Sequence, residues 1–236
     1  MKDFIRPWKV GLDCIWSVPL VAVGLVLILA PSSQAGLVGL VPTPPGSTVL
    51  SGLATDPPAT LLADLLLPFS FTTTAGTTSG TVESAVYREA GGTLDFYYQV
   101  VNSATSATAL TRETNTSFTG YNTDTGYLTD GSHLTGTTFV DGTVAPVFDD
   151  RSGTGAVNGF LFELNELSKI HPGETTHVLV ISTDATQFEA GNASVIDGGS
   201  QTVAAFQPAP GIPEPASIVL IAGGLLALAG FRKFRA

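Results

Sequence analysis

The sequence predicts an all-β protein, a β-sandwich, flanked by an N-terminal signal helix and a C-terminal transmembrane helix. Three observations support the sandwich. Short segments rich in Thr, Val, Phe and Tyr recur through the middle of the chain, and these residues fit the pleated surface of a sheet. Turn dipeptides such as Asp-Gly separate the segments. No amphipathic stretch there is long enough to form a helical layer. Many short strands joined by turns are typical of a sandwich, and the jelly roll is one such arrangement.

Residues 1–35 have the parts of a secretory signal peptide. Three basic residues open the chain, and an apolar run follows at 18–30. The small residues Ser33 and Ala35 occupy the positions that signal peptidase reads, so we expect cleavage after Ala35. An uncleaved membrane anchor is the alternative interpretation.

Residues 36–66 predict an extended lead-in. Five prolines interrupt this segment, and proline cannot donate a hydrogen bond to a sheet ladder. One edge strand is expected within it, at 48–53.

Residues 67–207 are predicted to form the sandwich domain. The clearest strand is 94–100, where apolar and polar residues alternate after a Gly91-Gly92 turn, as in a strand buried on one face. Further strands are expected at 67–73, 81–88, 107–118, 138–140, 159–163, 176–183 and 202–206. Residues 162–169 are expected to form one or two helical turns.

The tail has three parts in a fixed order, after a linker at 208–215 that ends in Pro213-Glu214-Pro215. An apolar run, 216–231, follows the linker, and Ser217 is its only polar residue. A helix without a polar face belongs in lipid or in a protein core. At its length of roughly 24 Å, it falls somewhat short of the ~30 Å hydrocarbon layer. The basic residues that follow the run are Arg232, Lys233 and Arg235.

The basic end favours the membrane interpretation over a buried core helix. Lys and Arg beside a membrane segment are retained on the cytoplasmic side. We therefore expect residues 216–231 to cross the membrane, with 232–236 inside and everything before Pro213 outside.

This tail resembles the PEP-CTERM sorting signal of exported bacterial proteins, also catalogued as the C-terminal segment of ice-binding proteins. The resemblance covers residues 212–236 only. It implies an inner-membrane anchored intermediate that an exosortase, a membrane protease or transpeptidase, cleaves near Pro213-Glu214-Pro215. It also implies a final location at the cell surface or in the extracellular matrix of bacteria that make exopolysaccharide and biofilm.

The part between the two expected cleavage sites is strongly acidic. Of the 20 acidic residues, all but Asp3, Asp13 and Glu214 lie there. Only four of the ten basic residues do, namely Arg88, Arg112, Arg151 and Lys169. Such a surface repels nucleic acid, so we expect no nucleic-acid partner. The only cysteine is Cys14, and no disulfide can therefore form in this part.

No catalytic motif is evident. The sequence lacks G-x-S-x-G, H-E-x-x-H, C-x-x-C and a phosphate-binding glycine loop, so we predict no enzyme and no cofactor. The histidines do not have metal-ligand spacing; they are His133, His171 and His177. Five aspartates in predicted loops raise the question of Ca²⁺, but residues 122–126 depart from the EF-hand pattern. We interpret them as solvated turn residues and predict no metal site; they are Asp124, Asp130, Asp141, Asp149 and Asp150.

These observations lead to one main hypothesis and two alternatives. The main hypothesis is an exported, acidic, non-catalytic protein of the surface or matrix, associated with exopolysaccharide or biofilm. The first alternative is a carbohydrate-binding module for exopolysaccharide, with tyrosine as the stacking residue because tryptophan is absent from 36–213. Its candidates are Tyr87, Tyr97, Tyr98, Tyr121 and Tyr127. The second is a matrix-acting hydrolase, which would need paired carboxylates across a cleft.

Overall fold

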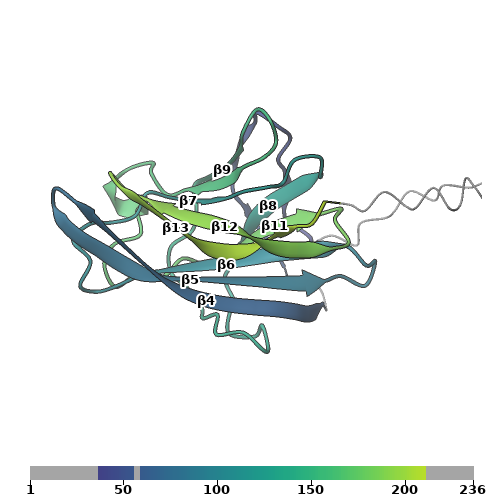
Figure 1. Ribbon diagram of the computed structural model, residues 1–236, viewed down its shortest axis with the longest axis horizontal. Helices are drawn as coiled ribbons and strands as arrows, with labels where there is room; N and C mark the ends of the chain where they lie inside the picture. Colours follow the sequence, from purple (N-terminus) through teal and green to yellow (C-terminus); the bar gives the residue numbers. More distant parts are fainter. Residues whose placement is uncertain (1–36, 56–58, 211–236) are drawn as a thin grey trace, which may run out of the picture. The chain divides into compact units, whose positions relative to one another are not determined.

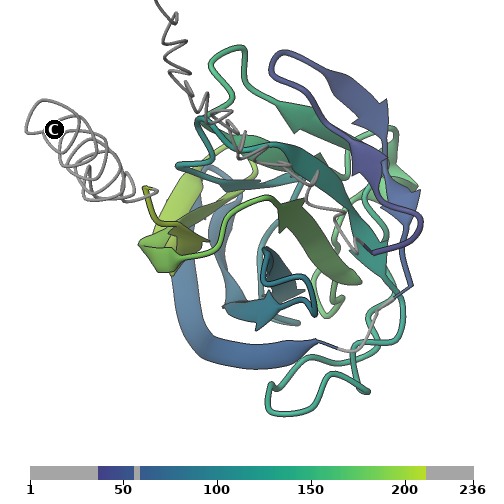
Figure 2. The same ribbon diagram turned by 90° about the vertical axis from the view of Figure 1, so that its right-hand side faces the viewer.

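The computed structural model describes residues 37–55 and 59–210, which we call the β body (Figures 1 and 2). Apart from one 3-10 turn at Glu166–Ser168 (η1), its regular elements are all strands. The all-β prediction is therefore confirmed. Within the β body, no helix is long and apolar enough to cross a membrane. The predicted signal peptide and the predicted membrane segment lie outside the described residues.

The first sheet of the β body has seven strands in the order β1-β8-β11-β6-β5-β4, with β3 also paired to β8. All of these pairs are antiparallel except β3 with β8. The strands are β1 (Val41–Pro42), β3 (Gly52–Leu53), β4 (Thr60–Thr73), β5 (Gly76–Arg88), β6 (Leu94–Asn102), β8 (Thr123–Leu128) and β11 (Val178–Thr183).

The second sheet has six strands in the order β13-β12-β7-β10-β9-β2, and all are antiparallel to their neighbours. The strands are β2 (Thr48–Leu50), β7 (Arg112–Asn115), β9 (Phe148–Arg151), β10 (Asn158–Leu161), β12 (Phe188–Ile196) and β13 (Ser200–Pro208).

One apolar core is shared by the two sheets. Phe96 and Ile181 enter it from the first sheet, and Phe160 and Val195 enter it from the second; none is more than 1% exposed. Phe118, in the loop between β7 and β8, packs edge-on against Phe96 with ring centroids 5.6 Å apart. This shared core agrees with the predicted β-sandwich, while the jelly-roll subtype stays a prediction.

The outer face of the first sheet is covered as well. A second apolar cluster there combines Tyr97 and Val180 from the sheet with Leu134 and Phe139 from the loop after β8. Strand β6 is consequently buried on both faces. The sequence predicted one solvated face, and this was wrong because the covering loop is contributed from elsewhere in the chain.

The segment predicted as a lead-in supplies strands to both sheets. The expected edge strand at 48–53 is divided into β2 and β3, which pair in different sheets. Strand β4 begins at Thr60 and forms a long hairpin with β5 (Figure 1). It contains Pro68, which is tolerated because β4 is an edge strand.

Four strands were missed and one predicted strand is wrong. Strands β1, β8, β9 and β12 were not predicted. Strand β12 is rich in Ala, Gly and Asn, and its pairing with β13 and β7 overrides this weak propensity. Residues 138–140 do not form a strand. The backbone N–H groups of Thr138 and Val140 instead donate to the side chains of Glu83 and Gln99.

Truncating a core side chain should destabilise the β body far more than truncating an exposed one. We expect Phe160→Ala to lower the free energy of unfolding by about 3–5 kcal/mol, because it removes apolar contacts and leaves a cavity. Leu167→Ala is the control, since Leu167 is 90% exposed, and it should change that free energy by no more than about 0.5 kcal/mol. Urea denaturation followed by circular dichroism measures both. Equal losses would contradict the assignment of the core.

Candidate functional site

The residues predicted for sorting lie outside the β body. This applies to the signal cleavage residues Ser33 and Ala35. It also applies to the sorting motif and the basic anchor, which are Pro213, Glu214, Pro215, Arg232, Lys233 and Arg235. A candidate site can therefore be built only from residues 37–55 and 59–210.

The aspartates of the predicted loops are scattered. Asp149 and Asp150 lie in β9, so their interpretation as solvated turn residues is wrong. Asp149 is buried, whereas Asp150 accepts two hydrogen bonds from Arg112, of 2.7 and 2.9 Å. Asp124 lies in β8. Among the described residues, no three His, Cys, Asp or Glu side chains come together as metal ligands.

The histidines lie apart and have separate contacts. His133 lies 3.3 Å from the carboxylate of Asp130. The ring of His171 bonds to the backbone carbonyl of Glu166. His177 stacks on Tyr127, with ring centroids 5.4 Å apart.

Three of the five candidate tyrosines cannot present a face to a ligand. Tyr87, Tyr97 and Tyr98 are buried, and the hydroxyl of Tyr98 donates to the carbonyl of Phe206. Tyr127 and Tyr121 are half-buried. Since Tyr127 is stacked on a histidine, Tyr121 is the tyrosine that lines an open groove.

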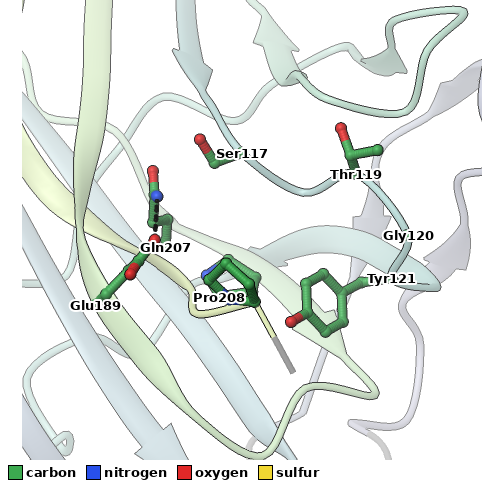
Figure 3. A pocket seen from close by; sticks show the side chains of 8 residues that line it. Ser117, Thr119, Gly120, Tyr121, Glu189, Gln207 and Pro208 are labelled. Carbon is green, nitrogen blue, oxygen red and sulfur yellow. Dashed lines mark hydrogen bonds between the residues drawn. The ribbon is translucent and has the colours of Figure 1, made fainter. Parts of the chain in front are cut away.

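The groove has a volume of about 650 Å³ and lies at the ends of β12 and β13 (Figure 3). Its lining combines hydroxyl, carboxylate, amide and apolar groups around a common space. The residues are Ser117, Thr119, Gly120, Tyr121, Glu189, Gln207, Pro208 and Pro210. A second hollow, of about 490 Å³, shares Gly120 and Tyr121 with the groove and reaches Asp124 and the prolines at 42–45.

Strand pairing positions one wall of the groove. Glu189 and Gln207 are opposite each other in the β12–β13 pair. Gln207 Nε2 donates to Glu189 Oε1 over 2.9 Å, which Figure 3 marks by a dashed line. Beyond β13, the N–H of Ala209 donates to the carbonyl of Gln187. This bond extends the pairing past Pro208, where the strand ends.

The opposite wall is the loop at 116–122, between β7 and β8. The Tyr121 hydroxyl donates to the carbonyl of Ala209, which joins this loop to the chain that leaves β13. Ser117 has φ = 70° and is the one non-glycine residue with a positive φ in the β body. Such a conformation costs roughly 1–3 kcal/mol and persists only where the surrounding structure imposes it.

Arg151 imposes that structure from beneath the loop. Its side chain is 4% exposed, and Nη2 donates to the carbonyls of Phe118 and Tyr121, each over 2.8 Å. The same guanidinium also bonds to the carbonyls of Gly155 and Thr43. Burial lowers the pKa of Arg151. These carbonyls replace the water that the cation loses, so the buried cation fixes the loop through hydrogen bonds to its backbone.

Two buried carboxyls lie in the second sheet, away from the groove. Glu113 has Phe160 and Val195 as cross-strand neighbours. Burial raises its pKa to about 8, although a 2.9 Å bond from Asn115 opposes the shift. Burial also raises the pKa of Asp149 to about 7. Both groups therefore favour the protonated form in the folded state.

A pair of carboxyls occurs on the first sheet, between β4 and β5. Burial and the neighbouring Glu83 raise the pKa of Asp64 to about 6. Glu83 accepts bonds of 2.6 Å from both the backbone and the hydroxyl of Thr138. Glu83 thus fixes the loop over the sheet, which is a structural role.

No family model, curated protein or solved structure matches this chain. The fold and the groove define it as an all-β protein with two facing sheets and an open groove of mixed polar and apolar lining at the strand ends.

Stability should decrease as the pH rises from about 6.5 to about 8.5. The pKa values of Glu113 and Asp149 are higher in the folded state than their ordinary values. The folded state therefore binds more protons in this range, and deprotonation favours unfolding. We expect a lower melting temperature at the higher pH, measured by differential scanning calorimetry.

Glu113→Gln is the matched control for this pH dependence. The amide keeps an acceptor for Asn115 but does not titrate, so the melting temperature should vary less with pH than in the unaltered protein. An unchanged slope would show that Glu113 does not cause the effect.

Proposed function

We propose that this chain is an exported bacterial protein that is sorted by an exosortase. Signal peptidase would cleave after Ala35, and the exosortase would cleave near Pro213-Glu214-Pro215. Residues 216–231 would hold the intermediate in the inner membrane, with the basic end in the cytoplasm. The mature protein would then reach the cell surface or the extracellular matrix. The observation that carries this proposal is the order of the three parts of the tail.

The proposed role of the β body is structural and non-catalytic, in a matrix that contains exopolysaccharide. Its acidic composition supports this role, because a high net charge keeps an exported domain soluble. A hydrolase would use two carboxyls on either side of a sugar, whereas the described groove lining includes one, Glu189. Asp64 and Glu83 are within hydrogen-bond distance of each other, which leaves no space for a sugar between them, and Glu83 is bonded to a loop.

A second candidate function is carbohydrate binding, and the groove at Tyr121 favours it. An aromatic ring beside hydroxyl, amide and carboxylate groups suits a ligand that has both apolar faces and hydroxyl edges. This function is compatible with the first, since a sorted matrix protein can also bind the matrix polymer.

The sorting proposal is tested by the intact mass of the protein recovered from outside the cell. We expect the mass of a chain that starts at Gly36 and ends near Pro213. Removal of the exosortase, or of residues 212–236, should change both the mass and the location. Leu167→Ala is a control, because a change on the exposed surface of the β body, outside the groove, should leave processing and location intact. An unchanged location after removal of the tail, with no mass change beyond the deleted residues, would contradict the proposal.

A further inference from the structure

We propose that the groove between the 116–122 loop and the ends of β12 and β13 binds a neutral polysaccharide, with Tyr121 as the stacking residue. This inference rests on the second candidate function and gives it a site, a ligand class and named contacts. In it, Glu189 and Gln207 recognise sugar hydroxyls, while Ser117 and Thr119 contribute hydroxyl groups from the opposite wall.

The lining matches the two kinds of surface that a pyranose ring presents. Tyr121 offers an amphipathic ring, and Pro208 and Pro210 add apolar surface nearby. On the other side, Glu189 is bonded to Gln207, which leaves carboxylate and amide groups with capacity for further hydrogen bonds. The volume of about 650 Å³ falls within the range of about 300–1,000 Å³ that is usual for ligand sites.

The groove is fixed before any ligand binds. Arg151 holds the backbone carbonyl of Tyr121, and the Tyr121 hydroxyl is bonded to Ala209. Phe118 anchors the same loop in the core. The conformational entropy of this loop is therefore lost during folding. A preformed site loses less conformational entropy when its ligand binds.

The charges around the groove select against anionic sugars. The described lining has no Lys or Arg, and it contains Glu189. Elsewhere in the β body, Arg112 pairs with Asp150, Lys169 pairs with Glu166, and Arg151 is buried. Arg88 is exposed at the end of β5, but it does not line the groove. The second hollow is lined by Asp124 and Arg151, but the Arg151 guanidinium is buried and already bonded to backbone carbonyls. An acidic polymer would therefore meet the Glu189 carboxylate without an exposed cation in the lining to offset the repulsion. The ligand class that fits is therefore a neutral, hydroxyl-rich chain.

The shape points to a polymer. The second hollow adjoins the groove through Gly120 and Tyr121. A chain crossing the ring of Tyr121 would occupy both hollows, so longer oligosaccharides should bind more tightly than a monosaccharide does.

The test measures binding of the full chain, purified in detergent, by isothermal titration calorimetry. The probes are neutral gluco-oligosaccharides of increasing length and an oligogalacturonate with and without calcium. We expect heat with the neutral probes, and affinity that increases with length. Tyr121→Ala should weaken binding at least about tenfold, because it removes the stacking surface, while its melting temperature verifies that it folds.

Two further variants separate the role of Tyr121 from general effects. Tyr121→Phe keeps the ring and should retain most of the affinity. Tyr127→Ala removes a tyrosine of similar exposure outside the groove and should leave binding unchanged. Glu189→Gln should weaken binding only a few-fold, because the amide still makes hydrogen bonds.

Each negative outcome has a distinct meaning. Binding that survives Tyr121→Ala would keep the carbohydrate-binding function but overturn this site. No heat with any probe would overturn the inference and the second candidate function together. Binding of the oligogalacturonate alone would keep the carbohydrate-binding function but overturn the neutral ligand class. Because the full chain is used, none of these results depends on exosortase processing, which the mass of the exported protein tests separately.

Discussion

The fold depends on the apolar contact between the inner faces of the two sheets. The β body has no cysteine, so packing alone must offset the conformational entropy of its chain. Phe96 and Phe160 show how the contact is made, one from each sheet and both fully buried. The loop that builds the groove joins the same contact through Phe118. The groove and the core are thus parts of one packing arrangement.

The second sheet places charged residue types inside this packing and deals with them in two ways. Arg151 keeps hydrogen bonds by collecting backbone carbonyls from several loops. Glu113 has few partners, and burial raises its pKa instead, which favours its neutral form. The hydrogen bonds of Arg151 position the loop at 116–122, which forms one wall of the groove. The raised pKa of Glu113 reduces the stability of the fold at neutral and alkaline pH, and Glu113 does not line the groove.

Local patterns predicted much of the fold but little of the site. The apolar run of β11 was sufficient to predict a strand there. Because β11 is buried on both faces, its sequence does not need to alternate between apolar and polar residues. The sequence of β12 has no comparable pattern, because this strand forms through its pairing with β13 and β7. The groove combines the loop at 116–122 with the ends of β12 and β13, which lie about 70 and about 90 residues later in the chain. Arg151, from a third element, holds the loop in place. Nothing near Tyr121 in the sequence distinguishes it from the four other candidate tyrosines.

The bond between Tyr121 and Ala209 places the chain's departure point from the β body at the rim of the groove. An affinity tag, a fluorescent fusion or a surface linkage attached just after Pro210 would begin beside the aromatic ring. A bulky attachment there would begin close to the opening even though it changes no residue of the lining. Reagents built on this protein should therefore be joined at its other terminus.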